Sequence, residues 1–238
     1  NQIAHLPDTV FHGLPKLEES VFHAKLGTQF QRVERLVKLA AEIAPKVGAD
    51  VVDAKRAAML AKADLPTGMV GEFPELQGIM GRYYATADGE PAEVCAAIDE
   101  HYLPRGAGGA LPGTGAGVAV ALADKLDTLA GIFAIGQKPS GTRDPFGLRR
   151  AAIGVLRILI EKKIDLDLRA LVSRASELQP VPHATAASEL WDYIIERLRA
   201  YFMDAGASTE MFDAVRAGGP VSPLDFGARR NALVGFLS

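Results

Sequence analysis

The chain has 238 residues, of which 48% are hydrophobic and 23% charged, an ordinary composition for one large or two small folded domains. Its formal net charge of −3 excludes a chain that is basic throughout, and no apolar run approaches the roughly 20 residues of a membrane-spanning helix. Because Cys95 is the one cysteine, no disulfide can form within the chain, which favours a reducing, cytoplasmic compartment.

The first part of the chain is predicted to be an irregular segment followed by one long helix. Residues 1–20 contain two prolines and a glycine, so we expect an irregular N-terminal segment there. From Leu17 onward apolar residues recur at steps of three and four, which predicts a helix with one buried face. Gly48 is suited to end this helix after Val47, because glycine readily adopts the left-handed conformation of a C-terminal cap.

The rest of the chain also reads as helices separated by glycine and proline. The helix over 67–86 is expected to be interrupted at Pro74. No alternating run of apolar and polar residues bounded by turn signals indicates a convincing strand, so the predicted fold class is all-α, with about nine helices and no substantial sheet. The remaining helices are expected at 50–64, 91–102, 116–135, 145–163, 167–177 and 186–203, and in two short segments at the C-terminal end.

A change of domain is predicted in the proline-containing segment 178–184, which we expect to be a linker. It would separate a helical domain over 21–177 from a smaller helical subdomain over 185–238. The last residues are apolar and carry no C-terminal cap, so we expect the chain to be a piece of a longer protein.

The stretch from Asp124 to Lys163 holds the strongest candidate site. Asp124 and Asp127 are three residues apart on a predicted helix and therefore share a face. After a Gly/Pro loop, Asp144 is placed to accept the free amides of the next helix, and Pro145 fits the first helical position because its missing N–H costs nothing there. A carboxylate pair and a basic helix thus flank one loop.

This basic helix and the loop before it carry a local excess of five positive charges, since seven Lys/Arg face two acids. Clustered cations bind the phosphates of nucleic acids. The alternative is that the arginines pair with Asp124, Asp127 and Asp144 and lock the helix hairpin. Arg150 and Arg157 are seven apart and share a face, as a phosphate-binding stripe requires. The candidate RNA-binding residues are Lys138, Arg143, Arg149, Arg150, Arg157, Lys162 and Lys163.

Two other features carry little chemistry. The glycine-rich stretch 103–117 superficially resembles a phosphate-binding loop, but no strand precedes it and it lacks the Gly-Lys-Ser/Thr ending. None of the five histidines has a partner at the i, i+4 spacing of a helical metal site. His101 is expected at a helix end, solvated or bonded to a carbonyl oxygen, and Cys95 is expected to be a buried, inert thiol.

The positions of two aspartates resemble those of the HD family of metal-dependent phosphohydrolases. In that family a His, a His-Asp pair and a later Asp hold a divalent metal, which generates the hydroxide nucleophile. Here Asp64 and Asp124 are present, but Ala63 stands where the paired His would be, and no His lies between His23 and His101. Two carboxylates alone hold a transition metal poorly, so an HD-like fold would be degenerate, with no metal.

The alternative to a degenerate HD site is a purely structural role. Asp64 and Asp124 would then serve as helix caps and as ion-pair partners of Lys62 and Lys125. The sequence favours this structural role.

Longer segments resemble a known family, the bacterial glycyl-tRNA synthetase β subunit, in its degenerate HD-like region. The resemblance runs in order from Val21 to about Val172, and the part from Ala186 onward is similar to the start of the anticodon-binding helical region. Residues 1–20 match nothing clearly. The segments that carry it are VFHAKLGT from Val21, RVER from Arg32, KADLPTGMV from Lys62, EFPELQGIMG from Glu72, ADKLDTLAGIF from Ala123 and DPFGLRRAA from Asp144.

The resemblance implies a part of an aminoacyl-tRNA ligase that attaches glycine to tRNA(Gly) in an α/β hetero-oligomer. It implies that ATP and Mg²⁺ act at the α subunit, that the β subunit binds tRNA and holds the assembly, and that this fragment is inactive alone, with no cofactor and no catalytic residue. Two other functions stay open: an HD-type phosphohydrolase acting on nucleotides, and a purely structural module that binds the α subunit.

Overall fold

Amphipathic helices build almost the whole chain, as the apolar periodicity predicts. The computed structural model describes residues 10–237 and divides the chain into two compact units, one ending at Asp127 and one beginning at Thr128. The division falls inside α7 (Gly115–Ala134), a long helix that belongs to both units. The predicted linker at 178–184 instead connects two helices within the second unit.

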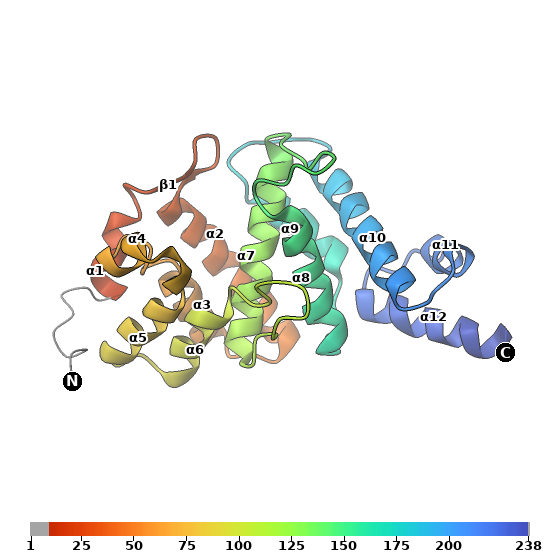
Figure 1. Cartoon of the computed structure of the whole chain (residues 1–238), viewed down its shortest axis with the longest axis horizontal. Coiled ribbons are helices and arrows are strands. Elements are labelled where there is room, and N and C mark those ends of the chain that lie inside the picture. The colour runs from red at the N-terminus through yellow and green to blue at the C-terminus, as the bar shows by residue number, and fades with distance from the viewer. Residues whose placement is uncertain (1–9, 238) are drawn as a thin grey trace. The chain divides into compact units, whose positions relative to one another are not determined.

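The first unit is a helical domain with one small hairpin (Figure 1). Its α2 packs along α3, and α6 packs on both α3 and α5. Its elements before α7 are α1 (Val10–Lys16), β1 (Val21–His23), β2 (Gly27–Thr28), α2 (Gln29–Ile43), η2 (Ala44–Val47), α3 (Val51–Leu60), α4 (Gly68–Glu72), η3 (Pro74–Leu76), α5 (Ile79–Ala87) and α6 (Ala92–Glu100).

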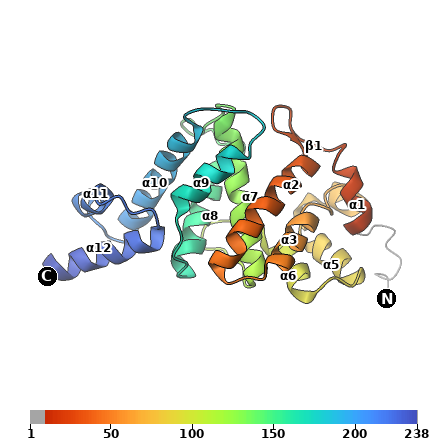
Figure 2. The ribbon, with the colours of Figure 1, turned by 180° about the vertical axis from the view of Figure 1, so that it is seen from behind.

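The second unit packs α10 against α8 and α9, and α12 against α8 and α11, as the view from behind also shows (Figure 2). The core side chains of α8 follow a helical period and include Leu148, Val155 and Leu159. The elements after α7 are α8 (Leu148–Glu161), α9 (Leu168–Glu177), α10 (Ala186–Asp204), α11 (Thr209–Ala217) and α12 (Pro223–Leu237).

Most of the predicted helices are confirmed, including the interruption at Pro74 and the left-handed Gly48 at φ 71°. The described part of the chain contains twelve α-helices rather than about nine. The all-α class is confirmed, with one two-stranded antiparallel hairpin that the sequence did not predict.

The beginning of the chain differs from the prediction in two places. Within the segment expected to be irregular, Val10–Lys16 is helical, while residues 1–9 lie outside the described part. The long helix predicted from Leu17 begins only at Gln29, because the hairpin intervenes. Thr28 and Gln31 form a reciprocal capping box that fixes the start of α2, and Gly27 permits the turn with φ 91°.

Candidate functional site

The two aspartates of α7 meet a matching pair of arginines from α2. Asp124 accepts a hydrogen bond of 2.9 Å from Arg32, and Asp127 accepts bonds of 2.6 and 3.2 Å from Nε and Nη2 of Arg35. Both pairs have a spacing of three, so two successive helical turns are joined face to face. The predicted shared face is therefore present, and the arginines that bind it lie 92 residues earlier in the chain, on α2.

A lysine completes this buried network. The Nζ of Lys62 lies 3.0 Å from Oδ1 of Asp124 and 2.8 Å from Nε2 of His101. The ammonium can only donate, so Nε2 of His101 accepts, and Nδ1–H donates to the carbonyl oxygen of Ile98 at 2.6 Å. His101 is thus a buried, neutral imidazole bonded to a carbonyl, as expected, but it is not solvated.

Burial and neighbouring charges shift the pKa values of this network in opposite directions. Burial lowers the pKa of Lys62 to about 8, against the attraction of Asp124. Burial also opposes ionisation of Asp124, but the charges of Arg32 and Lys62 outweigh it and hold its pKa well below the usual range. Burial and the charge of Lys62 lower the pKa of His101 well below its ordinary value. Asp124 therefore remains an anion at neutral pH.

Asp64 binds backbone amides instead of cations. One of its carboxylate oxygens accepts from the N–H groups of Gly78 at 2.6 Å and Gly81 at 3.1 Å, so it caps the beginning of α5. A Cβ added at Gly81 would lie 2.7 Å from Cγ2 of Ile98 and 3.1 Å from the same oxygen, which explains glycine at this close approach. Burial raises the pKa of Asp64, and the two amides oppose that shift.

The HD-like positions do not fit a metal ion. Ala63 supplies no ligand atom, one oxygen of Asp64 is taken by two amides, and Asp124 is held by two internal cations. Among the residues that the structure describes, no group of three or more His, Cys, Asp or Glu side chains is arranged to hold a metal. The arrangement matches the structural role of helix cap and ion-pair partner.

The contacts of Lys125 differ from the ion pair predicted for it. It was predicted to pair with a nearby aspartate, but its ammonium instead donates to the carbonyl oxygens of His101 at 3.2 Å and Leu103 at 2.7 Å. Burial lowers its pKa to about 8. Lys125 therefore satisfies the last carbonyls of the segment that follows α6.

The glycine-rich stretch is closed to phosphate by two carboxylates of α6. Glu100 accepts from the backbone N–H of Thr114 at 2.9 Å and from its hydroxyl at 2.7 Å, and Glu93 accepts from the N–H of Ala116 at 3.0 Å. Because these acids already occupy the positive end of α7, a bound phosphate would be repelled. The structure thus agrees with the sequence, which already argued against a phosphate-binding loop.

The predicted RNA-binding residues of the loop and α8 differ in their exposure and in whether other groups already bind them. Arg143, Arg150, Lys162 and Lys163 are exposed. Lys138 pairs with Glu189 of α10, and Arg149 donates to the carbonyl oxygen of Gly141.

Arg157 is the least available of the predicted RNA-binding residues. Its side chain is 13% exposed, and its guanidinium donates to Glu161 at 2.7 and 3.2 Å. The stripe of Arg150 and Arg157 is therefore weaker than their spacing suggests.

Asp144 holds the start of α8, although not with the predicted geometry. Its two carboxylate oxygens accept from the N–H groups of Leu148 at 2.8 Å and Arg149 at 3.0 Å. The expected capping role is confirmed, but α8 begins at Leu148 after the left-handed Gly147, so Pro145 does not occupy the first helical position. With both oxygens bonded to amides, Asp144 caps the helix and is not the arginine partner considered from the sequence.

Two residues of α10, Tyr193 and Arg197, add to the basic residues of the loop and α8. The sequence analysis did not identify them. The guanidinium carbon of Arg197 lies 5.2 Å from the ring centroid of Tyr193. Tyr193 interacts electrostatically with Asp144 and Arg149, so it lies against the beginning of α8. Tyr193 and Arg197 have the i, i+4 spacing of side chains that meet on a helix, and this spacing could have indicated their contact from the sequence. We call Arg143, Arg149, Arg150, Tyr193 and Arg197 the α8–α10 basic surface.

Cys95 is buried, as predicted, and its thiol donates to the carbonyl oxygen of Glu90. In the described part of the chain, no helix combines the length and the apolar character needed to cross a membrane.

Comparisons with known proteins assign the chain to a family. The family described as glycyl-tRNA synthetase beta subunit matches residues 8–217. A glycine--tRNA ligase beta subunit from Pseudomonas aeruginosa (strain LESB58) is 52% identical over 223 residues, which is 93% of this chain and 33% of that relative.

A second relative gives the same result. A glycine--tRNA ligase beta subunit from Aromatoleum aromaticum (strain DSM 19018 / LMG 30748 / EbN1) is 58% identical over 207 residues, which cover 86% of this chain and 30% of the relative. The chain therefore spans about one third of the length of the curated relatives that it matches. With a family match over most of its residues and relatives above half identity, the chain belongs to the glycyl-tRNA synthetase beta subunit family.

Proposed function

We propose that this chain is a tRNA-binding and assembly region of a glycyl-tRNA synthetase β subunit. In this role it supports the ATP-dependent attachment of glycine to tRNA(Gly) without catalysing it alone. Its family membership and the α8–α10 basic surface support the proposal together. ATP and Mg²⁺ act at the α subunit, with which the β subunit forms a hetero-oligomer in the cytoplasm.

The α8–α10 basic surface is the observation that carries the RNA-binding part of this proposal. Arg143 and Arg150 are exposed on the loop and the first turn of α8, and Arg197 adds a guanidinium that covers Tyr193. Asp144, the acid at the beginning of α8, is bonded to two amides and caps the helix. Exposed guanidiniums contact the phosphates of structured RNA, which is recognised largely through its shape and backbone.

Filter binding of a tRNA(Gly) transcript to the chain over a series of salt concentrations tests this function. Replacing Arg143 and Arg150 together by glutamate should weaken binding by about tenfold for each lost guanidinium contact. Each lost phosphate contact should also lower the slope of log affinity against log salt by about 1.

The matched control reverses two exposed lysines of the first unit, Lys25 and Lys55, which also changes the charge by four. This control should bind tRNA as the unchanged chain does. Salt-insensitive binding, or an equal loss in the control, would overturn the assignment to the α8–α10 basic surface. Absence of any tRNA binding would leave the purely structural module that binds the α subunit as the better function.

The HD-type phosphohydrolase is the weaker alternative, because the carboxylates it needs are engaged by Arg32, Lys62 and two backbone amides. Turnover of a nucleotide or phosphodiester with added divalent metal, lost in Asp64→Ala, would revive it.

A further inference from the structure

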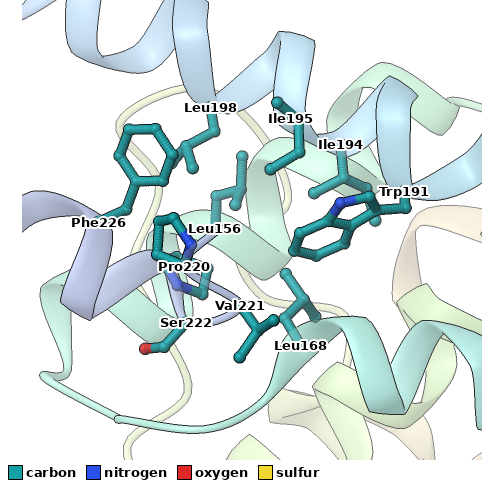
Figure 3. A pocket seen from close by; sticks show the side chains of 11 residues that line it. Leu156, Leu168, Trp191, Ile194, Ile195, Leu198, Pro220, Val221, Ser222 and Phe226 are labelled. Atoms are coloured by element: carbon teal, nitrogen blue, oxygen red, sulfur yellow. The ribbon is translucent and has the colours of Figure 1, made fainter. Parts of the chain in front are cut away.

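The one tryptophan of the chain lies in a hollow on the second unit, away from the α8–α10 basic surface. Trp191 and Tyr193 are two residues apart on α10, so their side chains point about 200° apart. Figure 3 shows the indole of Trp191 directed into the hollow, near Leu168 and Val221. The inner wall is apolar and comes from α8, α9, α10 and the start of α12.

The outer part of this hollow has a volume of about 130 Å³ and two arginines on its rim. Trp191 is partly exposed there, beside Pro220 and Phe226. The arginines are Arg169 of α9 and Arg216 of α11. A partly exposed indole and two guanidiniums therefore line the same hollow.

The two arginines differ in how their charge is balanced. Arg216 pairs with Glu196 at 3.3 Å and with Asp192 at 3.6 Å. Arg169 is exposed, and among the described residues it forms no ion pair; its guanidinium carbon lies 5.8 Å from the Trp191 ring centroid. Arg169 thus supplies an uncompensated positive charge over the indole ring.

We infer that this hollow binds one unpaired nucleotide of RNA, with the base stacked on Trp191 and the phosphate held by Arg169. The inference rests on the proposed tRNA-binding function and adds a second contact site to it. Aromatic rings and arginine planes are the usual platforms for unpaired bases, because every base has a π-face. The free charge of Arg169 complements a phosphate, whereas an apolar peptide would leave it unused.

Because the chain has one tryptophan, its intrinsic fluorescence reports directly on the hollow. Titration of the full chain with a single-stranded RNA hexamer should quench the emission of Trp191 as a base stacks on the indole. A blunt RNA duplex of equal charge has no unpaired base and should quench it far less.

Variants of the two residues separate stacking from charge. By filter binding, Trp191→Leu should lower affinity for the hexamer by about 5- to 150-fold, the range of a lost stacking contact. Arg169→Ala should lower it by about tenfold or more, the cost of a lost charged hydrogen bond to phosphate. Arg169→Lys keeps the charge but loses the guanidinium plane, so its loss should be smaller. Lys55→Ala removes one exposed charge from the first unit and should change neither the affinity nor the quenching.

The outcomes distinguish this inference from the function on which it rests. If the hexamer binds to filters without changing the emission, the hollow is not the site, and the proposed function stands. If no RNA binds in either measurement, both fail. Equal quenching by the duplex would show that the hollow responds to the charge of the RNA alone. It would overturn the inference that a base stacks on Trp191. If the emission of Trp191 changed with protein concentration in the absence of RNA, a second copy of the chain would occupy the hollow, and the inference would be overturned.

Discussion

Two buried aspartates of the first unit are stabilised by different partners and should respond differently to the loss of charge. Asp124 is bonded to Arg32 and Lys62, whereas Asp64 is bonded to the amides of Gly78 and Gly81. An asparagine oxygen can accept hydrogen bonds from amides as a carboxylate does, but it cannot neutralise two buried cations.

We therefore expect Asp124→Asn to lower the free energy of unfolding by about 3–5 kcal/mol, because it leaves buried cations without their anion. Asp64→Asn should cost about 1 kcal/mol, since the hydrogen bonds to the amides can be kept. Urea denaturation at pH 7 measures both values. Equal costs for the two variants would show that the ion pairs of Asp124 contribute no more than the amide bonds of Asp64.

At the scale of single elements, the beginning of α8 depends on one side chain outside the helix. Gly147, the residue before α8, has no side chain to bond the free amides, so Asp144 bonds two of them from three residues earlier. The same turn carries Arg149, whose guanidinium is held by the carbonyl of Gly141. The geometry of the α8–α10 basic surface thus depends on this cap.

Asp144→Ala should lower the free energy of unfolding by about 1 kcal/mol, the usual cost of losing a helix cap. Asp144→Asn should recover most of that loss, because its side-chain oxygen still accepts an amide. Thermal denaturation provides the comparison, with Asp165→Ala as a control that removes an exposed acid without removing a cap. A loss as large in Asp165→Ala would point to net charge and not to capping.

At the scale of the whole molecule, the buried lysines of the first unit govern how stability changes above neutral pH. Burial lowers the pKa of Lys62 from 10.5 to about 8, so the folded chain releases this proton at a lower pH than the unfolded chain. Between these values the unfolded state binds more protons, and stability therefore rises with pH. Lys125 contributes in the same direction.

We expect the free energy of unfolding to rise between pH 8 and 9.5, with Lys62 contributing up to about 3 kcal/mol over its full range to pH 10.5. Lys62→Met should flatten this rise, and Lys55→Met, which removes an exposed lysine, should leave it unchanged. Urea denaturation at constant ionic strength measures the profile below pH 10, because burial raises the pKa of Tyr102 well above 10 and reverses the trend there. An unaltered rise in Lys62→Met would contradict the assignment.

The sequence by itself determined the fold class, most helices and the family. Apolar residues at steps of three and four specify one buried face, whichever element the helix packs against. Gly48, Pro74 and Asp167 mark where a helix begins or ends through their effect on adjacent residues, so they can be recognised locally. The α2 boundary was missed because Leu26 keeps the helical spacing although it lies in the hairpin and is buried there.

Only the tertiary structure decided which charges meet. Arg32 and Asp124 are 92 residues apart, and no local period indicates that their helices lie face to face. The same holds for Glu100 at the beginning of α7 and for Arg197 beside the start of α8. A short-range pattern records which face of a helix is apolar, but the partner of a buried charge depends on how distant helices pack. For that reason the sequence shows Asp124 and Asp127 only as a carboxylate pair in a candidate site, whereas in the folded chain they belong to a structural ion-pair network.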